Sequence, residues 1–195
     1  MLESMIESLI PTRAEAADVA NAVWDGTDVV MLSGETSVGK HPVETVKMMH
    51  EIIINAEQHF IQNENIKFQI PEVLEENLFD SVLKGITSVA EQVKANAIVV
   101  FTFKGRAARG LAEFRPLSKI IALSDSFETM NNLCLRWGVN SLFINNIDKQ
   151  NAAITEAKEL ILNAGLVNKG ELVIFLSRAP VSESGRSDFL HFEIL

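Results

Sequence analysis

The feature that most restricts the fold of this chain is a regular alternation of apolar runs and amphipathic stretches after residue 77. Strand patterns rich in β-branched residues cover 97–102, 119–124, 141–145, 172–177 and 189–195; helical patterns cover 79–94, 105–114, 127–137 and 150–164. Continuous apolar strands that alternate with helices are typical of a mainly parallel sheet with helices on both faces. The last two runs have no helix between them, so we expect a five-stranded α/β sheet whose last strand is antiparallel.

The N-terminal residues carry a similar but shorter pattern. A helical pattern covers 14–25, an apolar run at 29–32 predicts a strand, and a long helix begins at Pro42 and ends near Phe60. The apolar stripe of that long helix consists of Val43, Val46, Met49, Ile53 and Ala56. A single strand with its helices cannot close a barrel, because eight strands need roughly 250 residues.

A polar stretch separates the two patterns. Residues 62–76 are broken by Pro71, which indicates a connector. We therefore expect an N-terminal piece over 1–61, a connector over 62–76 and a complete α/β domain over 77–195.

Charge and cysteine content exclude several classes of protein. The 195 residues include 17 basic and 26 acidic side chains, and the formal net charge of -9 argues against a nucleic-acid partner and against an anionic membrane surface. The only cysteine, Cys134, excludes an internal disulfide and a multi-cysteine metal site, and it indicates a reducing compartment. The first residues are acidic where a signal peptide is basic, and no run approaches membrane-spanning length. We expect a cytoplasmic protein.

The first candidate site follows the apolar run at 29–32, where Ser33 and Glu35 stand two residues apart. Loops at the carboxyl ends of strands carry chemistry in α/β folds, because the strand is rigid and the loop is exposed. A serine hydroxyl donates and accepts hydrogen bonds, and a carboxylate nearby orients it or exchanges a proton through water. The alternative is that both residues cap the following loop and helix.

The same loop also nearly fits a glycine-rich phosphate loop. Residues 34–40 begin with glycine and end with Gly39 and Lys40. That motif needs Ser or Thr after the lysine to bind Mg²⁺, and this chain has His41 there, followed by Pro42, which removes a main-chain donor. We therefore disfavour a nucleotide-binding loop.

The second candidate site lies between the runs at 97–102 and 105–114. Thr102, Lys104, Gly105 and Arg106 combine a hydroxyl, two cations and a glycine at the start of a predicted helix, which favours a phosphate group. The loop 177–188 contains two further cations, Arg178 and Arg186. The alternative is a solvated hairpin whose arginines face water.

These motifs together closely resemble the pyruvate kinase family. The resemblance is carried by residues 1–5, 11–23, 28–36, 103–108 and 180–185. It covers the whole chain, from the last part of the catalytic barrel through the C-terminal domain, but it corresponds to less than half of a pyruvate kinase. It implies that residues 29–32 are the eighth barrel strand.

The resemblance implies a parent enzyme that transfers phosphate from phosphoenolpyruvate to ADP with Mg²⁺ and K⁺, yielding pyruvate and ATP. Ser33 and Glu35 match its Ser-Gly-Glu-Thr motif, which is implicated in a polar network that helps protonate enolpyruvate. The family holds Mg²⁺, K⁺ and substrate phosphate on earlier barrel strands. We therefore expect this chain to be inactive alone and to bind no metal or other cofactor.

The resemblance also implies a regulatory role for the second candidate site. Residues 102–106 and 177–188 are similar to the loops where many pyruvate kinases bind the phosphate of an allosteric sugar phosphate or nucleotide. Family members are commonly tetramers, so we expect a homo-oligomer, with a dimer for this chain. The alternative is a purely architectural oligomerisation domain whose effector loop has decayed.

Overall fold

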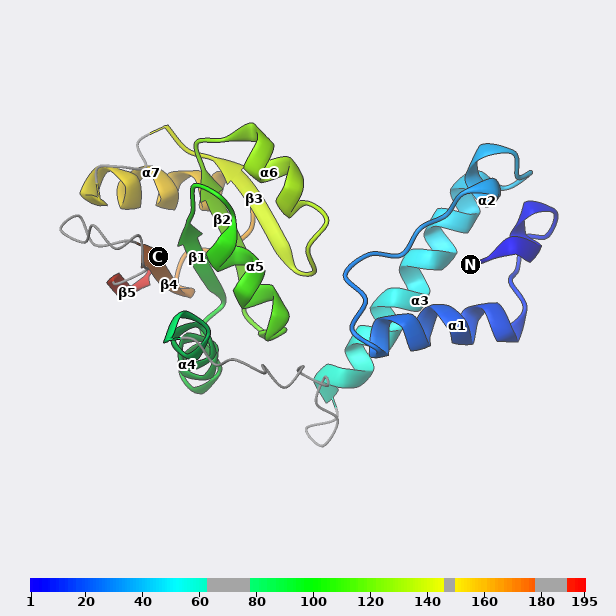
Figure 1. The fold of residues 1–195 in the computed structure, drawn as a ribbon, viewed down its shortest axis with the longest axis horizontal. Coiled ribbons are helices and arrows are strands. Elements are labelled where there is room, and N and C mark those ends of the chain that lie inside the picture. The colour runs from blue at the N-terminus through cyan, green and yellow to red at the C-terminus, as the bar shows by residue number, and fades with distance from the viewer. Residues whose placement is uncertain (63–77, 146–149, 178–188) are drawn as a thin grey trace. The chain divides into compact units, whose positions relative to one another are not determined.

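The computed structural model describes residues 1–62, 78–145, 150–177 and 189–195. The chain forms two compact units, Met1–Pro71 and Glu72–Leu195 (Figure 1). Of the predicted connector, only residue 62 is among the described residues, and it ends a helix.

The second unit is built on a single five-stranded sheet. Its strands are β1 (Ala97–Phe101), β2 (Lys119–Ser124), β3 (Val139–Phe143), β4 (Leu172–Ser177) and β5 (Phe189–Ile194). The order across the sheet is β3-β2-β1-β4-β5, and only the β4–β5 pair is antiparallel. The predicted mainly parallel α/β sheet with an antiparallel last strand is therefore confirmed. β3 begins and ends two residues before its predicted position, because residues 139–143 are the ones that pair with β2.

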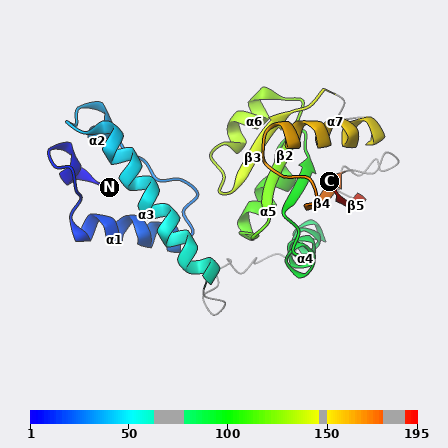
Figure 2. The ribbon, with the colours of Figure 1, turned by 180° about the vertical axis from the view of Figure 1, so that it is seen from behind.

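Helices cover both faces of this sheet, as predicted. They are α4 (Leu78–Gln92), α5 (Arg106–Glu113), α6 (Phe127–Leu133) and α7 (Gln150–Asn163). In Figure 1, α5 and α6 lie in front of the sheet, and in Figure 2, seen from behind, α7 crosses in front of it. The side chains of β1 alternate accordingly: Ile98 and Val100 pack in the cluster of α4, α5 and α6, and Val99 packs in the cluster of α7. All three side chains are fully buried, as expected for a strand covered on both faces.

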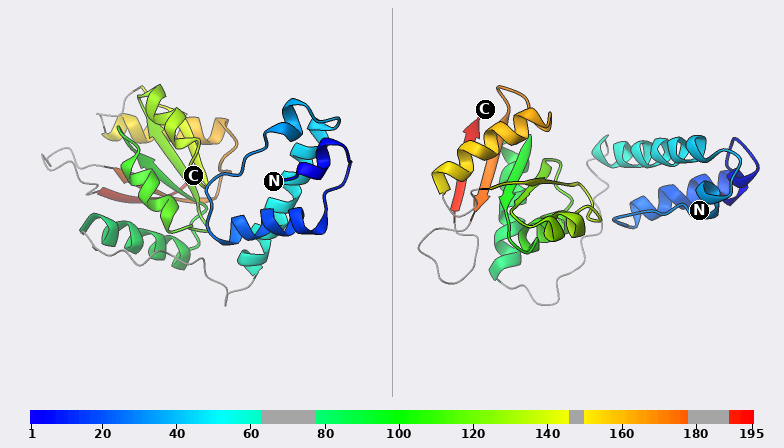
Figure 3. Two further views of the ribbon diagram at one scale, coloured as in Figure 1. Left: turned by 45° about the vertical axis from the view of Figure 1, so that its right-hand side comes forward. Right: turned by 90° about the horizontal axis from the view of Figure 1, so that it is seen from above.

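The first unit consists of helices around a small core. Its elements are η1 (Glu3–Ile6), α1 (Arg13–Trp24), α2 (Gly34–Ser37) and α3 (Pro42–Gln62). α1 and α3 run side by side (Figure 3). α1 ends at Trp24 and is followed, as predicted, by Gly26, whose φ of 88° suits the left-handed turn that stops a helix. Leu2, Met5, Val19 and Met49 form the buried core.

The strand predicted at 29–32 is not formed. Val30 and Leu32 pack partly buried against the core, while Val29 and Met31 on the other side are 49% and 73% exposed. No strand at all is present among the described residues of this unit. A strand needs a neighbour for its main-chain hydrogen bonds, so an apolar run by itself forms only an extended stretch here.

The apolar stripe predicted for α3 is wrong at its start. Val43 and Val46 are 58% and 53% exposed, whereas Met49 and Ala56 are buried as predicted. Thr45 takes the inward position in the first turns, where its hydroxyl donates to the carbonyl oxygen of His41 at 2.8 Å. A threonine can occupy this buried position because its own helix satisfies its hydroxyl group.

Candidate functional site

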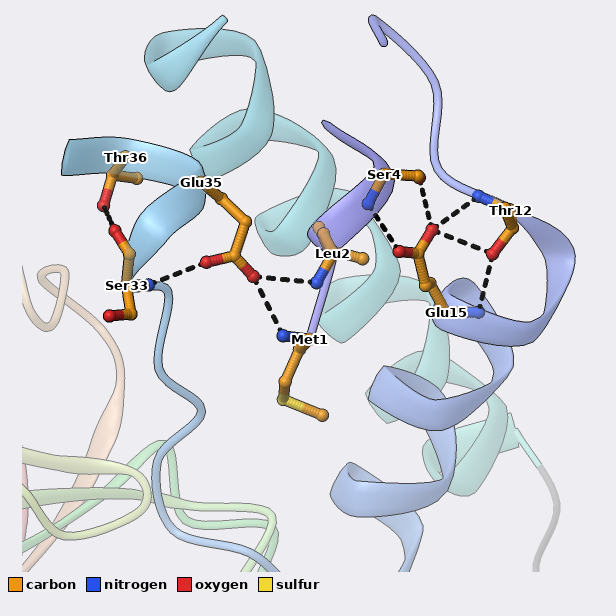
Figure 4. Close-up of polar contacts among 8 residues, drawn as sticks. All are labelled: Met1, Leu2, Ser4, Thr12, Glu15, Ser33, Glu35 and Thr36. Atoms are coloured by element: carbon orange, nitrogen blue, oxygen red, sulfur yellow. Dashed lines mark hydrogen bonds and ion pairs between the residues drawn. The ribbon is translucent and has the colours of Figure 1, made fainter. Parts of the chain in front are cut away.

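The carboxylate of Glu35 holds two segments of the N-terminal unit together. Glu35 lies in the first turn of α2 and is only 5% exposed. Its Oε1 accepts hydrogen bonds from the Leu2 main-chain N–H at 3.0 Å and from the Met1 ammonium group at 2.9 Å, and its Oε2 accepts from the Ser33 N–H at 2.8 Å (Figure 4). The contact with Leu2 spans 33 residues of sequence.

These donors keep Glu35 ionised. The ammonium group has the largest effect, and with the main-chain N–H groups it lowers the pKa of Glu35 from 4.5 to about 2 although burial opposes the change. At neutral pH the side chain is therefore a hydrogen-bond acceptor and not a proton donor. This arrangement favours a structural role for Glu35 in fixing the loop.

Ser33 contacts Glu35 through its main chain and not through its hydroxyl. The Ser33 carbonyl oxygen accepts from the Thr36 hydroxyl at 3.2 Å, and the Ser33 side chain does not cap α2. In Figure 4, the Ser33 hydroxyl points away from the Glu35 carboxylate. The structure brings the two predicted residues together, but without a hydroxyl–carboxylate contact. A catalytic role for them stays a prediction.

A second carboxylate, Glu15, was not among the predicted site residues. It accepts four hydrogen bonds: from the N–H and hydroxyl of Ser4, and from the N–H and hydroxyl of Thr12, the last two at 2.8 Å (Figure 4). Burial raises the pKa of Glu15, but the hydrogen bonds outweigh it and bring the value to about 2. The Thr-x-x-Glu spacing of a capping box is the sequence signal for this contact. Glu15 joins η1 to α1.

The glycine-rich stretch at 34–40 does not present a phosphate cradle. The N–H groups of Val38 and Gly39 both donate to the Gly34 carbonyl oxygen at 3.0 Å. The Lys40 N–H donates to the Ile6 carbonyl oxygen at 2.8 Å, and the Lys40 ammonium group pairs with Glu7. Since these donors are already used within the fold, the structure agrees with the sequence argument against a nucleotide loop.

The turn between β1 and α5 gathers four of the six residues predicted to bind phosphate. Thr102 is buried, and its hydroxyl oxygen accepts the Gly105 N–H at 3.0 Å. Gly105 precedes α5 with a φ of 73°, a left-handed conformation that favours glycine. The Thr129 hydroxyl of α6 donates to the Phe103 carbonyl oxygen at 2.7 Å, which ties the turn to the neighbouring helix. The main chain of this turn is therefore held on two sides.

The two cations of this turn differ in their surroundings. Lys104 is exposed. The Arg106 guanidinium lies 4.4 Å from the ring centroid of Phe79 on α4, in a cation–π contact, and Arg106 as a whole is exposed. No side chain caps the start of α5, so its first main-chain N–H groups add to the positive end of the helix. Arg178 and Arg186 lie outside the described residues.

In the part of the chain that the structure describes, no group of three or more His, Cys, Asp or Glu side chains is placed to hold a metal ion. No helix among the same residues is both long enough and apolar enough to cross a bilayer.

Two family models match the chain. The model described as "Pyruvate kinase, alpha/beta domain" matches residues 80–192, and the model described as "Pyruvate kinase, barrel domain" matches residues 1–46. The first match covers more than half of the chain and contains the turn between β1 and α5. The second contains Glu35 and the extended stretch at 29–32.

Curated relatives give the same result over the whole chain. A pyruvate kinase of Geobacillus stearothermophilus is 35% identical over 195 residues, which are 100% of this chain and 33% of the relative. A pyruvate kinase of Clostridium acetobutylicum is 33% identical over 100% of this chain and 41% of its own length. One of Agrobacterium vitis is 36% identical over 97% of this chain and 40% of its own length. The chain thus spans about a third to two fifths of the relatives that it matches.

Proposed function

This chain belongs to the pyruvate kinase family, and from that membership we propose that it supplies the end of the catalytic barrel and the regulatory α/β domain of a pyruvate kinase. Pyruvate kinases are phosphotransferases. The proposed reaction of the whole enzyme converts phosphoenolpyruvate and ADP to pyruvate and ATP with Mg²⁺ and K⁺, in the cytoplasm. Matches to relatives named pyruvate kinase over 97–100% of this chain support the proposal.

The chain by itself is proposed to be inactive. Phosphoryl transfer requires cations and metal-binding carboxylates arranged around the transferred group. The family resemblance assigns these groups to barrel strands that precede the matched segment. Glu35 is bound by main-chain donors and is no substitute for them. Turnover of phosphoenolpyruvate by the purified chain, after removal of host enzyme, would contradict this part of the proposal.

The α/β unit is proposed to bind the phosphate of a metabolite. The observation that carries this proposal is the turn at 102–106, in which Thr102 and Gly105 fix the main chain next to an uncapped helix start and two surface cations. Donors held in place lose little entropy when an anion binds, and cations beside them strengthen charge-assisted hydrogen bonds. A phosphate ester of a sugar or nucleoside fits this chemistry.

Calorimetric titration tests the proposed site. Fructose 1,6-bisphosphate, glucose 6-phosphate, AMP and inorganic phosphate would each be titrated into the full chain. We expect saturable binding of at least one ester and a loss of about tenfold or more in affinity for Lys104→Ala and for Arg106→Ala. Lys47→Ala removes an exposed charge from α3 and serves as the matched control. Absence of binding at millimolar ligand, or equal affinity of all variants, would contradict the proposed site.

A second candidate role is subunit contact through β5. β5 is an edge strand, and among the described residues no strand pairs with its outer side. Leu190, Phe192 and Ile194 lie on one face of it and are 37%, 42% and 69% exposed. An exposed apolar edge of this kind favours pairing with a second copy of the chain. If this contact forms, light scattering should give a dimer mass that Ile194→Lys reduces and Leu117→Lys, at an equally exposed position elsewhere, does not.

A further inference from the structure

Two carboxylates hold the start of η1 from opposite sides. Glu35 accepts the Leu2 N–H at 3.0 Å, and Glu15 accepts the Ser4 N–H at 2.7 Å. In Figure 4, the two carboxylates lie on opposite sides of Leu2 and Ser4. Because Glu35 belongs to α2 and Glu15 to α1, η1 is attached to both of these helices.

The contacts of Glu15 go beyond the capping of its own helix. In a capping box, the glutamate accepts the N–H of the N-cap residue, which is Thr12 here. Glu15 also accepts two hydrogen bonds from Ser4, one from its N–H and one from its hydroxyl. Helix capping does not require these two bonds, so they indicate a second task for Glu15, which is to fix η1.

Fixing η1 also fixes the carboxylate of Glu35 and the loop beside it. One oxygen of Glu35 accepts the Leu2 N–H, and the other accepts the Ser33 N–H at 2.8 Å. Leu2 is fully buried in the core of this unit, where packed side chains leave little room for movement. The Lys40 N–H donates to the Ile6 carbonyl oxygen at 2.8 Å and joins the same two segments again. A shift of η1 would therefore displace the loop that carries Ser33.

We propose that Glu15 is a positioning residue for Ser33, acting through η1 and Glu35. The proposal rests on the proposed function, in which Ser33 is the predicted catalytic hydroxyl. Ser33 is exposed, and its hydroxyl points away from the Glu35 carboxylate (Figure 4). Since the loop is anchored at the Ser33 main chain, the direction of this hydroxyl depends on how firmly that N–H is held. Glu15 supplies part of this support from the far side of η1.

The alternative is that Glu15 stabilises α1 alone, and three variants separate the two roles. Glu15→Gln keeps a side chain that works in a capping box but removes the charge that strengthens the bonds from Ser4. Ser4→Ala removes the hydroxyl donor and leaves the capping box of α1 in place. Thr12→Ala does the opposite, because it removes the N-cap side chain and keeps both donors of Ser4.

The test is NMR spectroscopy of the full chain and these variants at neutral pH. The proton chemical shifts of the Leu2 and Ser33 amides report their hydrogen bonds to a charged carboxylate, and the rates of hydrogen exchange report local opening. We expect Glu15→Gln and Ser4→Ala to shift both resonances and to speed exchange at both amides by about tenfold or more. Exchange in α3 should change by less than about twofold in the same variants, because the loss is local.

Thr12→Ala is the matched control for this experiment. We expect it to speed exchange in the first turn of α1 and to change exchange at Leu2 and Ser33 by less than about twofold. Ser33 signals that are unchanged in both Glu15→Gln and Ser4→Ala would overturn the proposal. Equal acceleration throughout α1 and α3 in all three variants, or unfolding of the N-terminal unit in both test variants, would also overturn it, since Glu15 would then only stabilise the fold.

This result is independent of the tests of the proposed function. A chain that binds no effector would lose the regulatory role, and the signals of Ser33 would still report on Glu15. Unchanged signals of Ser33 would remove the positioning role of Glu15 and would leave membership of the family and effector binding as they are.

Discussion

The two units of this chain contain similar apolar runs but use them differently. In the α/β unit, β1 lies between β2 and β4, and both of its faces are covered by helices. In the N-terminal unit, the run at 29–32 is covered on one side only and has no strand partner among the described residues. This difference shows that an apolar β-branched run forms a strand only where neighbouring strands accept and donate its main-chain hydrogen bonds. It also separates a unit that is complete by itself from one that presents an open surface.

The largest loss of stability is expected from a substitution in the core of the α/β unit, where both faces of the sheet are covered. Leu111 on α5 is fully buried against β1 and α4. Leu111→Ala leaves a cavity under a sheet that is covered on both faces, and we expect it to lower the free energy of unfolding of this unit by about 2–5 kcal/mol. Urea denaturation followed by far-UV circular dichroism measures the change. A loss below about 1 kcal/mol would mean that this core is loosely packed.

A smaller effect is expected where the N-terminal unit is tightly packed. A Cβ atom at Gly39 would lie 2.2 Å from the main-chain carbonyl oxygen of Glu35, and main chain cannot move aside as a flexible side chain does. Gly39→Ala should therefore destabilise the N-terminal unit by about 1–3 kcal/mol. Hydrogen exchange in α1 and α3 measures this effect, and exchange in β1 and β2 should stay unchanged as the internal control.

The next prediction concerns how the stability of the N-terminal unit depends on pH. The pKa of Glu35 lies at about 2 in the folded chain and 4.5 when unperturbed, so its ionised form stabilises the fold. This contribution, about 1–3 kcal/mol, is fully present above pH 4.5 and is lost as the pH falls from 4.5 towards 2. Glu35→Gln should remove most of it at pH 7 and flatten the pH dependence over that window. The measurement is urea denaturation of the N-terminal unit at a series of pH values.

The control for this pH prediction is Glu44→Gln, which changes an exposed glutamate of α3. It should leave the curve as it is in the parent chain. An equal loss of stability in both variants would show that net charge, and not the Glu35 contacts, governs the acid response.

The smallest effect is expected at the open surface itself. Met31 is 73% exposed, so Met31→Ser in the isolated chain should change the free energy of unfolding by no more than about 0.5 kcal/mol. The same substitution in a closed barrel would expose a polar group to an apolar interior. A large loss in the isolated chain would mean that Met31 is already covered.

Much of the α/β fold could be predicted from the sequence. The bounds of β2 and β4 agree with their predicted positions, because each strand is built on a continuous apolar run, 120–123 and 172–176, next to polar residues. The run at 29–32 has the same local pattern and formed no strand, since a pattern carries no information about the presence of a partner. α6 ends at Leu133, four residues before its predicted end, where the Arg136 N–H turns back to the Leu133 carbonyl oxygen.

The two candidate sites also differ in how much of their structure the sequence could predict. Thr102 and Gly105 are three residues apart, so their hydrogen bond is a local feature that strand-to-helix spacing can suggest. The bond from Leu2 to Glu35 joins residues 33 positions apart, and nothing in the sequence pattern predicts it. The sequence therefore indicated which residues carry polar groups, whereas the role of Glu35 as an ionised acceptor required the fold.

This chain combines an α/β unit whose sheet is covered on both faces with an N-terminal unit in which residues 29–32 have no strand partner among the described residues. Residue-resolved hydrogen exchange of the unmodified chain at neutral pH tests it most directly. We predict strong protection of the amides in β1, β2 and β4 and near-unprotected exchange at residues 29–32. Protection at 29–32 equal to that in β1 would contradict it, because those amides would then already have partners.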